Sequence, residues 1–243
     1  MRLRVRYSKL GKVRFVSHRD GARLWERALR RVDLPVAYTE GFTPRPKLSF
    51  GLALPTGAES VAEYIDIDLA KGADIDPAAS DWGDWTTSLG ESLSDALPVG
   101  IDVARVVDRD PSTGSLQEQV TSTTWEMTGP GIDPELLDSA TQRLLAADEL
   151  LVERERKGQR RTDDVRPLIR DLRPDDTGHK LVAELVTIGR ALRPAELATM
   201  VFPGIDAVGV RVLRTHQWIE SDGVRREVIP LDADLALDRG LSA

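Results

Sequence analysis

Basic side chains gather at the beginning of the chain. Residues 1–50 hold 13 Lys and Arg against 4 Asp and Glu, a net charge of +9, whereas the whole chain has a net charge of −7. The next sixty residues are strongly acidic, with 3 basic and 13 acidic side chains. A cationic segment in an acidic chain is typical of a surface that binds a polyanion, and nucleic acid is the commonest one. We therefore expect this segment to bind a ligand rather than to catalyse a covalent reaction.

Four arginines in this segment recur at helical spacing. A helix is predicted over residues 18–32, with Ser17 as its N-cap. Its apolar stripe consists of Gly21, Trp25, Ala28, Leu29 and Val32, and the opposite face carries Arg19, Arg23, Arg27 and Arg30 within about 80°. These arginines are candidates for phosphate contacts. The alternative is an ordinary solvated helix face, because Glu26 can pair with Arg30 at i,i+4.

A second basic run lies at residues 41–51, in a segment that two prolines stiffen. It contains Gly41, Phe42, Pro44, Arg45, Pro46 and Lys47. The aromatic ring is suited to stacking on a base, and the two cations are suited to phosphates. The alternative is a rigid connector with no binding role.

His18 is the one candidate for catalysis. A histidine at the start of this helix could act as general acid or base in a metal-independent ribonuclease, or it could simply bond locally. Asp66 and Asp68, with Glu63, alternate with apolar residues as on the exposed face of a strand, so we expect no metal site. The chain has no cysteine, which excludes thiolate zinc sites and cysteine-bound iron–sulfur clusters within it. No cofactor is therefore expected in this chain.

The periodicity of the chain predicts a repeated β-α-β-β-α-β order. In the first half, strands are expected at 2–7, 34–38, 48–54, 64–69 and 101–107, a short extended piece at 13–15, and helices at 18–32 and 76–93. In the second half, strands are expected at 121–127, 150–154, 181–188 and 208–215, and helices at 133–147 and 194–201. The predicted fold class is α+β, with two tandem ferredoxin-like (split β-α-β) units.

The predicted domain boundaries follow from this order and from composition. They are a basic N-terminal domain at 1–107, a linker at 108–119, a second domain at 120–219 and an acidic, partly mobile tail at 220–243. No stretch approaches the roughly 18 apolar residues of a membrane span. We therefore expect a soluble, cytoplasmic protein with no membrane partner.

Several short motifs resemble one bacterial family. The runs Phe15-Val-Ser-His-Arg-Asp20, Gly41-Phe-Thr-Pro-Arg-Pro-Lys-Leu-Ser-Phe-Gly51 and Leu54-Pro-Thr-Gly57 are similar to the radical-SAM-linked protein family, a domain of unknown function. The resemblance spans roughly residues 2–219. The family-motif positions are Ser17, His18, Gly41, Pro44, Pro46, Arg166, Arg193 and Arg214. The resemblance implies a protein encoded beside, or fused to, a radical S-adenosylmethionine enzyme with a cobalamin-binding region, and it implies no reaction.

The charge pattern and the resemblance together predict a non-catalytic RNA-binding accessory protein. It would work with a radical S-adenosylmethionine enzyme in tRNA or rRNA modification or processing, and that enzyme would carry the iron–sulfur cluster. Two alternatives stay open: a ribonuclease that uses His18, and an adaptor whose basic face docks an acidic protein. Arg2, Arg4 and Arg6 would lie on the opposite side of the sheet from the helix, so the two basic stripes could be separate surfaces of which only one binds a polyanion. Alternatively, one of the two stripes could meet the acidic stretch 59–110 of the same or another chain.

Overall fold

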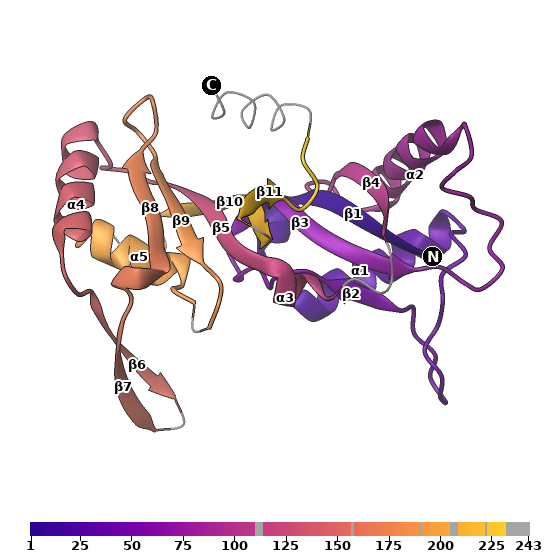
Figure 1. Ribbon diagram of the computed structural model, residues 1–243, viewed down its shortest axis with the longest axis horizontal. Coiled ribbons are helices and arrows are strands. Elements are labelled where there is room, and N and C mark those ends of the chain that lie inside the picture. Colours follow the sequence, from indigo (N-terminus) through magenta and orange to yellow (C-terminus); the bar gives the residue numbers. More distant parts are fainter. Residues whose placement is uncertain (110–113, 157, 190, 205–208, 222, 232–243) are drawn as a thin grey trace. The chain divides into compact units, whose positions relative to one another are not determined.

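The chain divides into two compact units (Figure 1). The computed structural model describes residues 1–109, 114–156, 158–189, 191–204, 209–221 and 223–231. Unit 1 consists of Met1–Gln119 and the described residues from Arg226 onward. Unit 2 consists of Val120–Arg225. Unit 1 is therefore discontinuous in the sequence.

Unit 1 contains an antiparallel sheet, and a helix lies in each of the two connections that cross over between its strands. Its elements are β1 (Arg2–Lys9), the 3₁₀ turn η1 (Gly11–Phe15), α1 (His18–Arg31), β2 (Leu48–Phe50), β3 (Glu59–Asp68), α2 (Trp82–Ala96), β4 (Val103–Arg109) and α3 (Leu116–Gln119). The strands follow the order β4-β1-β3, and β2 pairs with β3. The residues of β3 that pair with β2 also pair with β1, so the two partners occupy opposite edges of β3.

The core of unit 1 follows from two amphipathic elements. In β1, Leu3 and Val5 are fully buried, as the period-2 pattern predicts. In α1, the Ser17 hydroxyl accepts a hydrogen bond from the backbone N–H of Asp20 at 3.2 Å, which confirms the predicted N-cap. Trp25 and Leu29 on the apolar stripe of α1 pack into the same core as β1, β3 and α2.

Several predicted elements of unit 1 differ in the structure. The strand predicted at 48–54 ends at Phe50, and the strand predicted at 64–69 begins earlier, at Glu59. Residues 13–15 belong to a 3₁₀ turn rather than to an extended piece, after Gly11 takes a positive φ of 67°. Residues 34–38 form isolated bridges instead of a strand. The second helix begins at Trp82, because the Asp76 carboxylate closes a turn onto the N–H of Ala78 and does not cap the helix.

Residues 36–47 form a projecting hairpin, which we call the arm (Figure 1, the violet hairpin below the N-terminus). The Thr39 N–H donates to the Arg45 carbonyl at 2.8 Å, and the Lys47 N–H donates to the Ala37 carbonyl at 2.8 Å. At the base, the Ala37 N–H donates to the Asp68 carbonyl of β3 at 2.7 Å. Within the segment 41–51, residues 41–47 are therefore the tip and second side of a hairpin, and residues 48–50 continue as β2.

Unit 2 has a second antiparallel sheet. Its elements are β5 (Val120–Thr128), α4 (Pro134–Ala146), β6 (Leu151–Arg156), β7 (Gln159–Asp164), the 3₁₀ turn η2 (Arg166–Leu168), β8 (Ile169–Pro174), β9 (Leu181–Val186), α5 (Pro194–Val201) and β10 (Arg211–Ser221), and β11 (Val224–Glu227) crosses its boundary. The strands follow the order β10-β5-β9-β8. Strands β6 and β7 form a separate two-stranded hairpin.

One strand of unit 2 was assigned to the wrong segment. The predicted strand at 150–154 corresponds to β6 of the separate hairpin, and the sheet position next to β9 belongs to β8. The sequence of β8 hides this role, because Ile169 and Leu172 are its only buried residues and a bulge interrupts the period between them. Helix α5 begins and ends where it was predicted.

The mixed α and β composition is confirmed, with antiparallel pairing in each unit. Residues 110–113 of the predicted linker and 232–243 of the predicted mobile tail lie outside the described residues, as does residue 208 at the start of a predicted strand. Within the described ranges, none of the helices is both long and apolar enough to cross a lipid bilayer.

Candidate functional site

The four arginines of α1 form one exposed row, which we call the arginine ridge. Arg19, Arg23, Arg27 and Arg30 are all exposed. Helix α1 has 14 residues and is therefore about 21 Å long. Arg23 pairs with Asp20 at 3.2 Å, but both side chains are more than half exposed, so the pair contributes little and a competing phosphate can replace it.

The arm carries the other predicted binding residues. Phe42 at its tip is completely exposed, and Arg45 and Lys47 on its returning side are exposed as well. The chain enters the arm directly after α1, where the Leu34 N–H donates to the Leu29 carbonyl at 3.2 Å. The arginine ridge therefore ends next to the base of the arm within unit 1.

The second basic stripe, on β1, is neutralised within the unit. Arg4 donates two hydrogen bonds to the Asp66 carboxylate, at 2.6 and 2.9 Å, and both side chains are almost fully buried. Arg109 of β4 also pairs with Asp66. Arg2 pairs with Asp68 at 2.5 Å.

Arg6 completes this stripe, and it too is engaged inside the unit. It is buried and donates to the carbonyl of Ile229 at 2.7 Å. Of the two possible basic surfaces, this one therefore meets the acidic segment 59–110 of its own chain and is unavailable to a polyanion. Asp66 and Asp68 serve as partners of these arginines, and the described residues contain no cluster of His, Cys, Asp and Glu suited to a metal ion.

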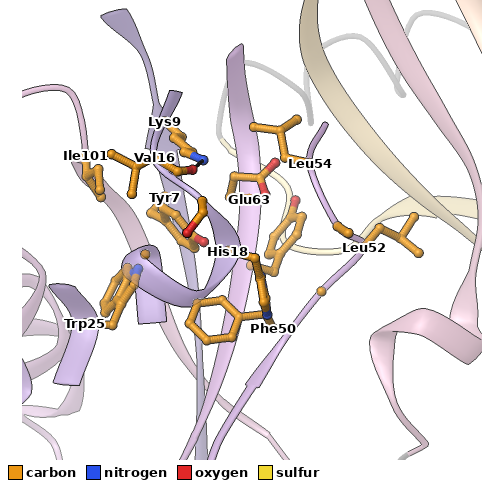
Figure 2. A pocket seen from close by; sticks show the side chains of 15 residues that line it. Tyr7, Lys9, Val16, His18, Trp25, Phe50, Leu52, Leu54, Glu63 and Ile101 are labelled. Carbon is orange, nitrogen blue, oxygen red and sulfur yellow. Dashed lines mark hydrogen bonds between the residues drawn. The ribbon is translucent and has the colours of Figure 1, made fainter. Parts of the chain in front are cut away.

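A small pocket lies at the other end of α1 (Figure 2). It offers about 50 Å³ to the centre of a water molecule. Its lining comes from the start of α1, from the segment after β2, from β1 and from β3. The residues of these segments include Val16, Ser17, His18, Gly21 and Trp25; Phe50, Gly51 and Leu54; Tyr7 and Lys9; and Glu63 and Tyr64.

The polar groups of the pocket are a lysine and a carboxylate from neighbouring strands. The Lys9 ammonium donates to the Val16 carbonyl at 2.8 Å, and it faces the same space as the Glu63 carboxylate (Figure 2). Burial lowers the pKa of Lys9, and the charge of Glu63 opposes this shift. A partly desolvated lysine in a cleft is a common feature of functional sites.

Aromatic rings form another part of the wall, beside aliphatic side chains. The His18 ring lies edge-on to Phe50, with centroids 5.0 Å apart, and Tyr7 lies edge-on to Trp25 at 4.9 Å. His18 itself is exposed at the mouth of the pocket. Tyr64 donates its hydroxyl to Glu227 at 2.6 Å, and burial raises the pKa of that hydroxyl. The pocket thus combines aromatic surfaces with hydrogen-bonding groups, among them the Lys9 ammonium as a donor and the Glu63 carboxylate as an acceptor.

Sequence reasoning did not bring these residues together. All three family motifs, 15–20, 41–51 and 54–57, contribute lining residues, but the sequence predicts no role for Lys9 and places Glu63 only on a strand face. Among the family-motif positions, Ser17 and His18 lie at the pocket. Gly41, Pro44 and Pro46 lie on the arm, where Gly41 has a positive φ of 126° that favours glycine.

The three remaining family-motif arginines lie in unit 2 and have local structural partners. Arg166 donates to the carbonyl of Leu145 at 3.1 Å. Arg193 precedes α5, and its backbone N–H donates to the Glu196 carboxylate at 2.9 Å. Arg214 is buried, with its guanidinium 5.3 Å from the centre of the Trp125 ring. The side-chain contacts of Arg166 and Arg214 indicate roles in the stability of unit 2, whereas the bond from Arg193 uses only its backbone.

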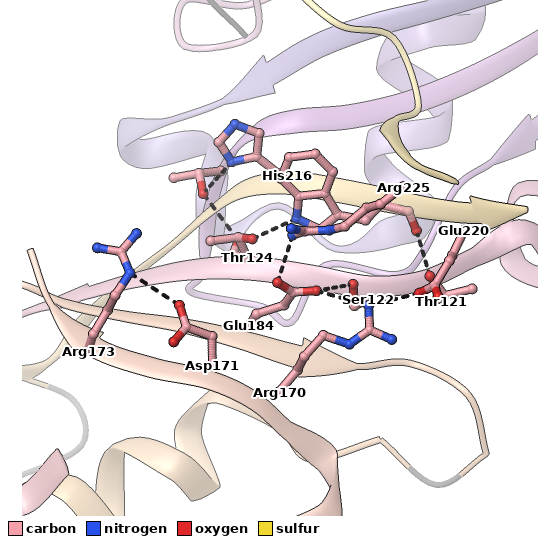
Figure 3. Close-up of polar contacts among 12 residues, drawn as sticks. Thr121, Ser122, Thr124, Arg170, Asp171, Arg173, Glu184, His216, Glu220 and Arg225 are labelled. Atoms are coloured by element: carbon pink, nitrogen blue, oxygen red, sulfur yellow. Dashed lines mark hydrogen bonds and ion pairs between the residues drawn. The ribbon is translucent and has the colours of Figure 1, made fainter. Parts of the chain in front are cut away.

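A polar network covers part of the unit 2 sheet (Figure 3). The Glu184 carboxylate accepts hydrogen bonds from Arg225 at 2.6 Å and from Ser122 at 2.6 Å. The Arg225 guanidinium lies 3.8 Å from the centre of the Trp218 ring, and His216 stacks on the same ring at 5.0 Å. The acidic and basic groups satisfy one another, so we assign this network to the stability of the sheet.

Comparison with known protein families matches residues 2–194 to the family described as "Uncharacterized protein conserved in bacteria (DUF2344)". The match covers most of the chain and includes all of the pocket, the arginine ridge and the arm. The chain therefore belongs to this family of bacterial proteins. The description names no activity and no partner, so the link to a radical S-adenosylmethionine enzyme stays a prediction. None of the curated proteins compared with the sequence matches it.

Proposed function

We propose that the protein is a cytoplasmic RNA-binding accessory protein that binds structured RNA, such as tRNA or rRNA, through unit 1. The contact surface consists of the arginine ridge and the arm. Phosphates would lie along α1 and against Arg45 and Lys47, and Phe42 would stack on an exposed base.

The observation that carries this proposal is the difference between the two basic stripes. The arginines of β1 have carboxylate and carbonyl partners inside the unit, whereas the arginines of the ridge, from Arg19 to Arg30, reach solvent along about 17 Å of helix. A continuous row of exposed cations of this length can follow several phosphates of one strand. The projecting arm then supplies a base-stacking group beyond the end of the row.

We also propose that both units are variants of the ferredoxin-like fold. The strand orders β4-β1-β3-β2 and β10-β5-β9-β8, with antiparallel neighbours and a helix in each crossover, support this assignment. In unit 2 the hairpin β6–β7 would be an insertion between the first helix and the second strand of the sheet. Sheets of this kind commonly serve as RNA-binding domains.

A radical S-adenosylmethionine enzyme is the proposed partner, with RNA modification or processing as the joint activity. The support is the resemblance of the motifs at 15–20, 41–51 and 54–57 to the radical-SAM-linked proteins. Because the chain has no cysteine, the partner would hold the iron–sulfur cluster. Affinity purification of the tagged protein from its native host at low salt tests this point, and recovery of no such enzyme would contradict it.

The RNA proposal is tested by measuring the affinity for bulk tRNA as a function of salt concentration. We expect micromolar or tighter binding, with log affinity falling with log salt at a slope of about −3 to −5, which corresponds to about four to six neutralised phosphates. The variant Arg23→Ala/Arg27→Ala should weaken binding and flatten the slope by about one to two.

A matched control removes the same charge from unit 2. Arg160 and Arg161 on β7 are also exposed, so Arg160→Ala/Arg161→Ala changes the net charge equally but leaves the ridge intact. This control should bind tRNA with an unchanged slope. Equal losses in both variants would mean that total charge, and not the ridge, determines binding. Absence of any binding at low salt would favour the adaptor with an acidic protein partner.

One observation favours a ribonuclease as a second candidate. His18 stands at the mouth of a pocket that also holds Lys9 and Glu63, and these residue types can share acid–base work. A ribonuclease would cleave RNA without metal, and His18→Ala would abolish cleavage while binding survives. Cleavage that persists in His18→Ala, or none by the wild type, would exclude this candidate.

A further inference from the structure

The pocket at the start of α1 contains a glycine that the backbone does not require. Gly21 lies inside α1, its φ is not positive, and no atom comes within 4 Å of the position that a Cβ would occupy. Glycine destabilises a helix interior by about 1 kcal/mol relative to alanine. The absence of a side chain at Gly21 therefore leaves open space in the wall of the pocket. The backbone conformation at this position does not require glycine.

The size of the pocket limits what it can hold. A single water requires about 10–15 Å³ when volume is measured to its centre, so 50 Å³ corresponds to about three to five waters. At about 30 Å³ of liquid volume each, these waters occupy about 100–150 Å³. That space holds one six-membered ring with its substituents, whereas a two-ring system would fill it completely.

The polar groups define the chemistry of the ring. The described contacts of Lys9 use one of its three N–H donors, for Val16, and the ammonium therefore has the capacity to donate to a ligand. The Glu63 carboxylate has about four acceptor positions, so it can accept a further bond beside its present contacts. A ring that offers an acceptor next to a donor on one edge complements this pair. The pyrimidine bases have such an edge: N3 beside N4–H₂ in cytosine, and O2 or O4 beside N3–H in uracil.

The position of the pocket connects it to the proposed RNA surface. His18 at the pocket mouth immediately precedes Arg19, the first residue of the arginine ridge. A strand whose phosphates follow the ridge would reach the pocket mouth at the N-terminal end of α1. Its base would meet the aromatic side chains of His18 and Phe50 before the polar groups inside.

We propose that this pocket receives one unpaired pyrimidine base of the bound RNA, turned out of its stack. Phe50 and His18 contact the ring, Lys9 donates to its acceptor and Glu63 accepts from its donor. This inference rests on the proposed function, because the arginine ridge delivers the strand. It adds a base-selective step to binding that is otherwise insensitive to sequence.

The test uses a labelled RNA hairpin with one bulged nucleotide in its stem and a GAAA loop. The bulged position then carries the only unpaired pyrimidine. The bulge is cytidine, uridine, adenosine or an abasic site, and the dissociation constant of the full-length protein is measured by fluorescence anisotropy. We expect the abasic RNA to bind about 5–100-fold more weakly than the cytidine and uridine RNAs, the range typical of one stacked base. The adenosine RNA should resemble the abasic one.

Gly21→Leu is the decisive variant, because it fills the pocket without changing any charge. It should bind all four RNAs at the abasic level and keep the wild-type salt slope. Gly83→Leu is the matched control: Gly83 also lies in a helix, at an exposed position of α2 with no atom within 4 Å of its Cβ position. This control should discriminate among the RNAs as the wild type does. Circular dichroism verifies that both variants fold.

The outcomes separate the two proposals. Salt-dependent binding with equal affinity for the cytidine and abasic RNAs overturns the pocket inference and leaves the RNA surface standing. Discrimination that persists in Gly21→Leu also overturns it. Equal preference for adenosine and cytidine disproves the pyrimidine assignment. If the wild type binds none of the hairpins at low salt, the proposed RNA function fails, and the pocket inference fails with it.

Discussion

Asp66 and Asp68 make the same kind of contact at different depths, which allows a quantitative test of burial. Asp66 binds Arg4 through two hydrogen bonds and also pairs with Arg109, and its side chain is 3% exposed. Removing one partner from a buried pair costs about 3–5 kcal/mol, because the remaining charge stays out of water. Asp66→Ala leaves the guanidinium groups of both Arg4 and Arg109 without this carboxylate. We therefore expect it to lower the free energy of unfolding by at least about 3–5 kcal/mol.

Asp68 provides the control two residues away on the same strand. It also forms two hydrogen bonds with one arginine, Arg2, but the two side chains are 27% and 21% exposed. Solvent screens this pair, so Asp68→Ala should cost about 1 kcal/mol or less. Urea titrations followed by circular dichroism and tryptophan fluorescence measure both values. If the two variants agree within about 0.5 kcal/mol, burial does not determine the strength of these pairs and the reasoning is wrong.

Three further predictions concern single side chains. Gly21→Ala should raise the free energy of unfolding by about 1 kcal/mol in a urea titration, because the added methyl meets no atom and alanine favours the helix; a decrease would show that the Cβ position is obstructed. Burial opposes ionisation of Glu196, but hydrogen bonds from Arg154 and Arg193 lower the pKa of this carboxyl overall. The ionised carboxylate therefore stabilises the fold above the pKa of Glu196 in the unfolded chain, and this stabilisation disappears as pH falls through the pKa in the folded protein. Glu196→Gln should therefore lose less melting temperature on acidification than the wild type, and parallel curves would contradict this. Burial lowers the pKa of Lys9, so as pH rises its ammonium should lose its proton earlier than an ordinary lysine does. The preference for pyrimidine RNAs in the anisotropy assay should decline over the same pH range, and Lys9→Met should show no such decline.

Local signals account for the parts of the fold that the sequence predicted well. Helix α1 was expected at 18–32 and spans His18–Arg31, because its N-cap and its amphipathic stripe both lie within the segment itself. The arm was missed because Pro44 and Pro46 suppress a strand pattern, and its sides are joined by a few backbone hydrogen bonds. Strand β8 was missed because a bulge breaks its period.

The candidate site divides in the same way. The arginine ridge could be predicted because helical spacing alone brings its side chains into one row. Neutralisation of one basic stripe by the acidic stretch could be proposed, but not which stripe or which partners, because these depend on the register that sets Arg4 opposite Asp66, and a slip of one residue would turn the carboxylate to the other face. The pocket depends on Tyr7 pairing with Glu63 across two strands and on the return of residues 50–54 past α1. No single segment contains that information.

The discontinuity of unit 1 has a consequence for how the protein is made. Arg6 and Tyr64 take partners from Ile229 and Glu227, and unit 2 separates these positions from Gln119 by 106 residues. At a translation rate of about 5–20 residues per second, the ribosome needs about 5–20 s to bridge that gap. During this time a buried guanidinium and a buried hydroxyl of the nascent unit lack these partners. Unit 2 can fold while unit 1 waits, so the first domain to emerge is the last to be completed.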